Sequence, residues 1–157
     1  MAFKYTENGK LDPIDKRILA VLAQDGRIAY TDLAQLVGLS KSPCQARVKR
    51  LQTQGYIKGF RAVLDPEMLD VNHIAFVEVK LNDTSEAALS AFNKAVSKVY
   101  EIEQCHMIAG AFDYLMKVRT SDIQTYRRIL GETISALPHV ANTSTHVCME
   151  TVKDEAF

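Results

Sequence analysis

The stretch that decides the fold is residues 26–55, GRIAYTDLAQLVGLSKSPCQARVKRLQTQG. Its first half predicts a short amphipathic helix, whose apolar residues recur at helical spacing: Leu33, Leu36 and Val37. Thr31 precedes this run and is expected to cap the helix. Gly38 is expected to end it, because glycine readily takes the left-handed conformation that closes many helices.

The second half of the stretch predicts another helix, which begins at once. Ser40 or Ser42 is expected to cap it, Pro43 suits its first turn, and Gly55 ends it. Its inner face is apolar, with Val48 and Leu51, and its other sides carry polar and basic groups: Gln45, Arg47, Lys49 and Arg50. This arrangement predicts a helix-turn-helix that reads DNA with its second helix. An ordinary helical hairpin with solvated charges is the alternative.

The segments on either side extend this module. Residues 56–64, YIKGFRAVL, predict short strands around a Lys-Gly turn, which would form a small basic wing. Ahead of the stretch, Asp12 and Pro13 predict the start of a helix whose apolar stripe comprises Ile14, Ile18, Val21 and Leu22. We therefore expect a mobile arm over residues 1–10, a winged helix-turn-helix domain over 11–64 and a linker over 65–73.

The rest of the chain, residues 74–157, alternates between strand and helix patterns. The expected order is strand 74–81, helix 85–99, strand 102–109, strand 112–119, a helix from Asp122 or Ser121 to about residue 137, and strand 140–152. This β-α-β-β-α-β order is that of the ferredoxin-like fold, and the whole chain is therefore α+β. Helices cover one face of such a sheet, so we expect a homodimer through the other face. A dimer would also place two recognition helices on neighbouring major-groove segments.

The charge is unevenly divided, although the formal net charge is zero. Residues 1–62 contain eleven Lys and Arg against five Asp and Glu, whereas residues 63–157 contain eight against fourteen. A basic part joined to an acidic part is typical of a nucleic-acid-binding module tied to a module with another task.

The apolar runs and the cysteines indicate where the protein acts, and they argue against a membrane protein and a secreted protein. No apolar run approaches the roughly 18 residues of a membrane span, and no signal peptide is recognisable. The three cysteines, Cys44, Cys105 and Cys148, lack metal-site spacing, so we expect a cytoplasmic protein with buried thiols and no membrane contact. A redox switch at Cys44, near a helix N-terminus that would lower its pKa, is the alternative.

No enzyme motif is present in the sequence. The chain has no P-loop, no GxSxG and no HExxH. Cys105 and His106 are adjacent, so in a strand they point to opposite faces and do not act together easily. We predict a protein without catalytic residues, metal or cofactor.

Several segments together resemble the Lrp/AsnC (feast/famine) family of transcription factors, and within it the leucine-responsive members. They are LDPIDKRIL, DGRI, LVGLSKSPCQARVKRLQTQGYIKGF, AFVEVKL, CHMIAGAFDYLMKVRT, YRRILGET and THVCMETVK, which span residues 11–153. The resemblance implies a bacterial regulator with an N-terminal DNA-binding domain and a C-terminal amino-acid-sensing and oligomerisation domain, the RAM domain. It also implies that dimers assemble further, often to octamers, with the effector bound where dimers meet.

The expected contacts to double-stranded DNA lie on the second helix and beside it. Phosphate or base-edge contacts are assigned to Lys41, Arg47, Lys49 and Arg50, with Lys58 and Arg61 from the wing and Arg27 near the backbone. Ser40, Ser42 and Gln45 stand at the start of the recognition helix and are the base-edge candidates, since glutamine can pair bidentately with adenine. Arg47 could instead pair with an acid in its own domain.

The expected contacts to a free amino acid rest more on the resemblance. A carboxylate at a subunit junction, Asp113, would bind the ligand ammonium, and backbone N–H groups around Gly110 would hold its carboxylate. An apolar wall is implied at Met107, Ile123, His146, Val147 and Cys148. Asp113 could instead only stabilise its turn. His146 stands where leucine-responsive members have tyrosine, which favours either a pH-sensitive response or a plain surface histidine.

The function predicted from the sequence is a DNA-binding transcriptional regulator that responds to an amino acid, leucine-like by resemblance. A ligand-independent DNA-organising protein and a metabolite-binding regulator of an enzyme are the alternatives. The salt dependence of binding distinguishes the enzyme regulator from the two DNA-binding functions, because DNA binding through several Lys and Arg weakens steeply as the salt concentration rises.

Overall fold

The computed structural model describes residues 11–154, and the chain forms two compact units that divide between Val63 and Leu64. The arm predicted over residues 1–10 lies outside the described residues. Across residues 11–154, none of the helices has the length and apolar character needed to cross a membrane.

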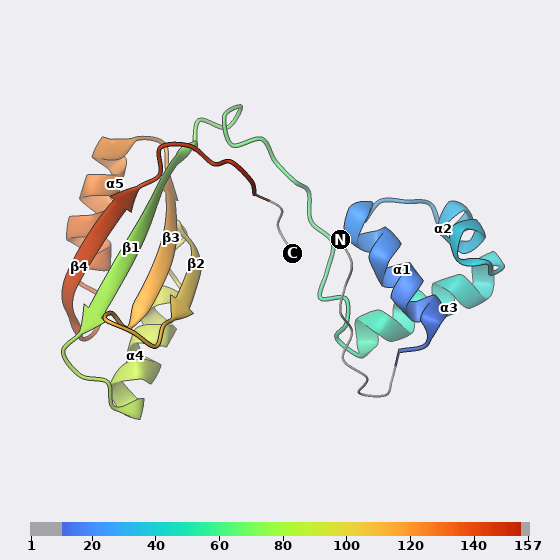
Figure 1. Ribbon diagram of the computed structural model, residues 1–157, viewed down its shortest axis with the longest axis horizontal. Helices are drawn as coiled ribbons and strands as arrows, with labels where there is room; N and C mark the ends of the chain where they lie inside the picture. Colours follow the sequence, from blue (N-terminus) through green and yellow to red (C-terminus); the bar gives the residue numbers. More distant parts are fainter. Residues whose placement is uncertain (1–10, 155–157) are drawn as a thin grey trace. The chain divides into compact units, whose positions relative to one another are not determined.

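The N-terminal unit is built from α1 (Pro13–Gln24), α2 (Tyr30–Val37) and α3 (Lys41–Thr53). Figure 1 shows the three helices crossing one another around a common centre. That centre is a cluster of buried side chains: Ile18, Leu33, Ala34, Val37, Cys44, Val48 and Leu51. The tight connection between α2 and α3 confirms the predicted helix-turn-helix.

The ends of these helices follow from local sequence. Asp12 caps α1 and forms a reciprocal capping box with Asp15, in which the Asp15 N–H donates to Asp12 Oδ1 at 2.8 Å. Gly38 follows α2 with φ +75°, and Gly55 follows α3 with φ +79°. At both positions a side chain would strain the left-handed backbone, so both predicted glycine stops are confirmed.

Two details of α2 differ from the prediction. The helix begins at Tyr30 with Ala29 as its N-cap, so Thr31 lies in the first turn and does not cap it. Leu33, Ala34 and Val37 face the core, whereas Leu36, which was predicted on the apolar face, is 53% exposed. Ser40 is the N-cap of α3, but its side chain forms no capping hydrogen bond.

The predicted wing strands are wrong, because no residue from 54 to 72 is in a strand. Gly59 does not take a positive φ, so the Lys58-Gly59 turn that a hairpin would need is not formed. The start of the segment bonds to its own domain instead, since the N–H groups of Tyr56 and Ile57 donate to Leu51 O at 2.9 and 3.2 Å. A two-stranded hairpin without a third strand is only marginally stable, so the backbone bonds to α3 form in place of the predicted hairpin.

The C-terminal unit contains one sheet and its covering helices. Its elements are β1 (His73–Leu81), α4 (Glu86–Val96), β2 (Ile102–Met107), β3 (Tyr114–Thr120), α5 (Ile123–Ile129), the π-helical turn η1 (Leu130–Ile134) and β4 (Val140–Val147). The strand order is β2-β3-β1-β4, with every neighbouring pair antiparallel. Figure 1 shows α4 and α5 on one side of this sheet. The predicted ferredoxin-like architecture is confirmed.

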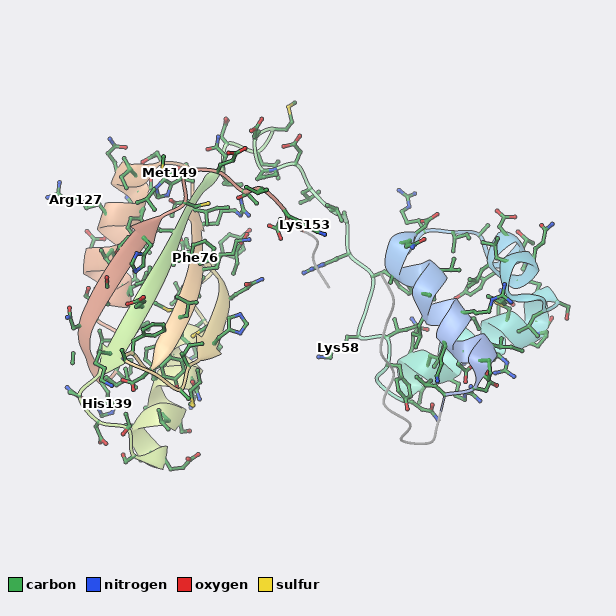
Figure 2. All side chains as sticks on the ribbon, viewed as in Figure 1. Lys58, Phe76, Arg127, His139, Met149 and Lys153 are labelled. Atoms are coloured by element: carbon green, nitrogen blue, oxygen red, sulfur yellow. The ribbon has the colours of Figure 1, made fainter. Side chains whose placement is uncertain are left out.

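The two faces of the sheet differ in what covers them. Alternate residues of β1 and β3 are buried against the helices: Ala75, Val77, Val79, Leu81, Tyr114, Met116, Val118 and Thr120. On the other face, Phe76, which is labelled in Figure 2, is 37% exposed. Glu78 and Lys80 follow it at alternate positions of the strand and share that face. That face is the one on which the predicted sheet-to-sheet contact would form.

The last strand is shorter than predicted. It ends at Val147, and residues 148–154 are not in a strand. Val147 pairs with Ala75, and the Cys148 N–H still donates to Ile74 O at 2.9 Å. β1 begins at His73 and therefore offers almost no further residues for pairing. The chain leaves the sheet at this point.

Gly38→Ala should lower the free energy of unfolding by about 1–2 kcal/mol, because alanine at φ +75° is strained although no atom crowds the new methyl group. Gly131→Ala is the matched control. It lies in η1 without a positive φ and with open space around it, so it should be neutral or slightly stabilising. Chemical denaturation followed by circular dichroism measures both, and equal effects would contradict the strain argument.

Candidate functional site

The outer face of α3 carries a continuous polar stripe. Ser42, Gln45, Ala46 and Lys49 follow one another at helical spacing, and all are exposed. Their spacing places them opposite the buried side chains Cys44, Val48 and Leu51. The structure thus brings together four of the predicted DNA contacts of the helix, Lys41, Ser42, Gln45 and Lys49, on solvent-facing positions. Ser40, Arg27 and Lys58 are also exposed but lie outside α3.

The two arginines of α3 are held by acids of α1. Arg47 Nη1 donates to Asp12 Oδ2 and, at 2.9 Å, to Asp15 Oδ1. Arg50 Nη2 donates to Asp15 Oδ2. The alternative that Arg47 pairs within its own domain is therefore the observed one. We name Asp12, Asp15, Arg47 and Arg50 the acid–arginine cluster.

Hydrogen bonds favour the charged forms of two members of this cluster, Asp12 and Arg47. The Asp15 N–H and then Arg47 lower the pKa of Asp12 below its ordinary value. The bonds to Asp12 and Asp15 raise the pKa of Arg47. Sequence reasoning did not single out Asp15. A signal for it exists in LDPID, where two acids three residues apart at a helix start are the pattern of a capping box.

Cys44 is not placed for the redox role considered above. Its side chain is fully buried in the core of the N-terminal unit. Burial raises the pKa of its thiol, which is the reverse of the shift a reactive cysteine needs. Desolvation of the buried thiol is the cause of this upward shift of the pKa.

Asp113 is held by its neighbours at the end of β1. Its Oδ2 accepts the Leu81 N–H at 2.8 Å, and its Oδ1 pairs with Lys80 Nζ at 3.0 Å. The Leu81 N–H and, after it, Lys80 lower the pKa of Asp113. Its own N–H donates to Val79 O, and its carbonyl accepts the Ile108 N–H. This carboxylate therefore stabilises the β2–β3 connection, whatever else it binds.

The predicted effector residues fall into two groups within one chain. Met107, Gly110 and Asp113 lie at or after the end of β2, one edge strand of the sheet. His146 and Val147 lie on β4, the opposite edge strand, followed by Cys148, while Ile123 begins α5. The fold of a single chain does not bring the two groups together.

The apolar members of both groups face solvent. Met107 is 57% exposed, Ile123 is 45% and Val147 is 50% exposed. His146 is also exposed, and its Nε2 lies 3.3 Å from Glu78 Oε1. Large apolar side chains exposed at two edges are the kind of surface that a neighbouring molecule covers.

A separate cavity of about 490 Å³ lies between the open face of the sheet and residues 148–154. Ile74 and Phe76 form part of its wall, and Lys117 pairs across it with Asp154 at 2.9 Å. Cys148 is the one predicted effector residue among its lining side chains. Sequence reasoning missed this feature because it depends on where the chain turns after β4.

Both units match known family models. Residues 11–58 match a model described as winged helix-turn-helix DNA-binding. Residues 74–156 match a model described as the Lrp/AsnC ligand binding domain.

Relatives match over nearly the whole chain. A proline dehydrogenase transcriptional activator from Rhizobium radiobacter is 63% identical over 92% of both chains. A protein of the same description from Rhodobacter capsulatus is 52% identical over 92% of this chain and 94% of its own. The leucine-responsive regulatory protein of Escherichia coli is 48% identical over 91% of this chain and 87% of its own.

Solved structures agree with the fold. An AsnC family transcriptional regulator from Agrobacterium tumefaciens has a TM-score of 0.86 at 30% identity, over 92% of this chain and 94% of its own. A transcriptional regulator from Neisseria meningitidis in complex with L-methionine has a TM-score of 0.85 at 28% identity, over the same shares.

Asp113→Ala should destabilise the C-terminal unit by about 1–3 kcal/mol, because the buried Leu81 N–H loses its acceptor. Asp113→Asn should cost less, since its amide oxygen can still accept that bond. Hydrogen exchange at the Leu81 amide and urea denaturation measure both effects. The lowered pKa of Asp113 means that its contribution is present above its unfolded pKa and lost as the pH falls through the folded value, so both variants should flatten the acid side of the stability curve.

The control for this prediction is Asp154→Ala. Asp154 also pairs with a lysine at 2.9 Å, but that bond is to an exposed carboxylate, and no backbone N–H of residues 11–154 donates to it. We expect a loss of no more than about 1 kcal/mol. An equal loss in both alanine variants would show that the Leu81 bond is not what Asp113 supplies.

Proposed function

The chain belongs to the Lrp/AsnC family of transcriptional regulators, and from that premise we propose that it activates a proline dehydrogenase gene in response to free proline. Family membership confirms the resemblance inferred from the sequence. It also makes the chain a regulator rather than an enzyme, as the sequence predicted, with a DNA-binding and a ligand-binding domain.

The observation that carries the proposal is the order of the relatives. Two proteins described as proline dehydrogenase activators are 63% and 52% identical to this chain, above the 48% of the leucine-responsive protein of Escherichia coli. An enzyme that consumes proline is useful when proline is present, so proline itself is the natural signal. The leucine-like effector expected from the resemblance becomes the second candidate.

We place the effector between two copies of the chain. One copy would contribute Met107, Gly110 and Asp113, and the other Ile123, His146, Val147 and Cys148, because these groups lie at opposite edges of one sheet. An ionised carboxylate has about four acceptor sites. Two sites of Asp113 are used by Leu81 and Lys80, which leaves room for a ligand ammonium.

The proposed assembly links this site to DNA. A homodimer through the open sheet faces would present two α3 helices, and further association, to an octamer by family resemblance, would close the effector sites. Ligand that binds at such a junction changes the spacing or number of DNA contacts, and DNA changes ligand affinity by the same factor. The proposed place of action is the cytoplasm.

The purified protein should be stabilised by L-proline in a thermal-shift assay against all twenty amino acids, with D-proline as the control for non-specific solvent effects. Ligand at about 100 times its dissociation constant adds roughly 2.7 kcal/mol to the native state. L-proline should also change the affinity for DNA from upstream of a proline dehydrogenase gene. A response to leucine alone would select the second candidate, and no response to any amino acid would favour a DNA-organising protein.

Two defective chains should complement each other if two copies share each site. Met107→Asp should abolish the ligand response of one chain and Ile123→Asp that of another, because each puts a charge against the ligand. Co-expressed in differently tagged form and purified as mixed assemblies, they should regain part of the response, since some junctions then pair two intact halves. A mixture as inert as its parents, with normal assembly size, would place both halves of the site in one chain.

A further inference from the structure

The acid–arginine cluster gives the two arginines of α3 different surroundings, although both were expected to contact DNA. The Asp15 side chain is 1% exposed, and its two oxygens accept from different arginines. Asp12 adds a second carboxylate and is itself fixed as the N-cap of α1. Two acids therefore oppose two bases, and the middle of α3 is tied to the first turn of α1.

Arg47 is committed to these acids. One nitrogen, Nη1, donates to both carboxylates, and the side chain is 26% exposed. Successive residues of a helix are about 100° apart around its axis. Arg47 therefore lies between the exposed side of α3, which carries Ala46, and the buried side, which carries Val48. Its two hydrogen bonds to side chains of the described residues both go to acids at the start of α1.

Arg50 is only partly committed. Its side chain is 45% exposed, and Nη2 alone bonds Asp15. A guanidinium has five N–H donors, so most of those of Arg50 remain available. Arg50 lies one helical turn after Ala46 and next to Lys49, on the border of the exposed polar stripe.

We propose that Asp15 is a positioning residue that aims Arg50 at a DNA phosphate, while Arg47 clamps α3 to α1 and makes no DNA contact. The inference rests on DNA binding through α3. A carboxylate that holds one edge of a guanidinium fixes the direction of its other edge, so Arg50 meets a phosphate without first losing its side-chain freedom. Arg47 is less exposed than Arg50 and bonds two carboxylates instead of one, so the readers of DNA on α3 are then Ser42, Gln45, Lys49 and Arg50.

The salt dependence of binding to a mixed-sequence DNA duplex tests this assignment. Each phosphate contact contributes about 0.9 to the slope of log affinity against log salt concentration. Arg50→Gln and the matched variant Lys49→Gln should each lower the slope by about 0.9 for every bound subunit. Arg47→Gln should keep the wild-type slope while lowering Tm. Lys94→Gln, an exposed cation of α4, is the control that should change neither.

The outcomes separate the inference from the function on which it rests. A wild-type slope for Arg50→Gln, or a reduced slope for Arg47→Gln, overturns the assignment of the arginines. A wild-type protein that binds no DNA, or binds it without salt dependence, overturns DNA binding itself. If Arg47→Gln fails to fold, Arg47→Lys keeps a charge opposite the acids and should show the wild-type slope.

The positioning role of Asp15 requires a measurement whose result would not change if Asp15 only stabilised the fold. In an Asp15→Asn background, Arg50→Gln should weaken DNA binding by a smaller factor than it does in the wild-type protein, because Arg50 is no longer aimed. Equal factors in the two backgrounds would overturn the positioning role. Arg47→Lys in the same background is the comparison for general loosening of α3.

Discussion

The burial of the Asp15 carboxylate is the constraint on which the N-terminal unit depends. A charge that is 1% exposed needs partners, and the nearest bases are on α3. The helix that presents polar groups to DNA is therefore oriented by an ionic contact as well as by the apolar core around Leu33, Val48 and Leu51. Hydrophobic packing alone allows α3 to shift along or rotate about its axis relative to α1. Two arginines of α3 bonded to one carboxylate of α1 restrict both motions.

The elements that the sequence predicted well are those set by neighbouring residues. The period of 3.6 identified α1, α2 and α3, the period of 2 identified β1 and β3, and Gly38 and Gly55 marked helix ends through backbone geometry alone. The elements it missed depend on distant partners. Residues 56–64 carry a strand-like pattern, but the N–H groups of Tyr56 and Ile57 bond to Leu51 O in α3. β4 stops early because β1 begins at His73 and offers few further pairing residues.

The candidate site divides in the same way. The exposed stripe of α3 could be read from spacing, because helix periodicity fixes which side chains share a face. The pairing of Arg47 with Asp12 and Asp15 joins residues more than thirty positions apart, and the sequence offered only the general alternative that Arg47 pairs with some acid in its own domain. Asp113 stays a predicted ligand contact. Its bond to the Leu81 N–H fits the alternative that it stabilises its turn, and this bond depends on the register of the sheet and is invisible in the sequence.

The topology of the sheet also constrains how an amino-acid signal could act. Met107 and Val147 lie on opposite edge strands, and no motion that preserves the order β2-β3-β1-β4 brings them together. If both contact one ligand, they belong to different copies, and the ligand binds more tightly to associated chains than to separate ones. Its effect is then exerted on association first, and on DNA through the number and spacing of the α3 helices that an assembly presents. A regulator of this kind needs no internal relay from sensor to DNA-binding unit.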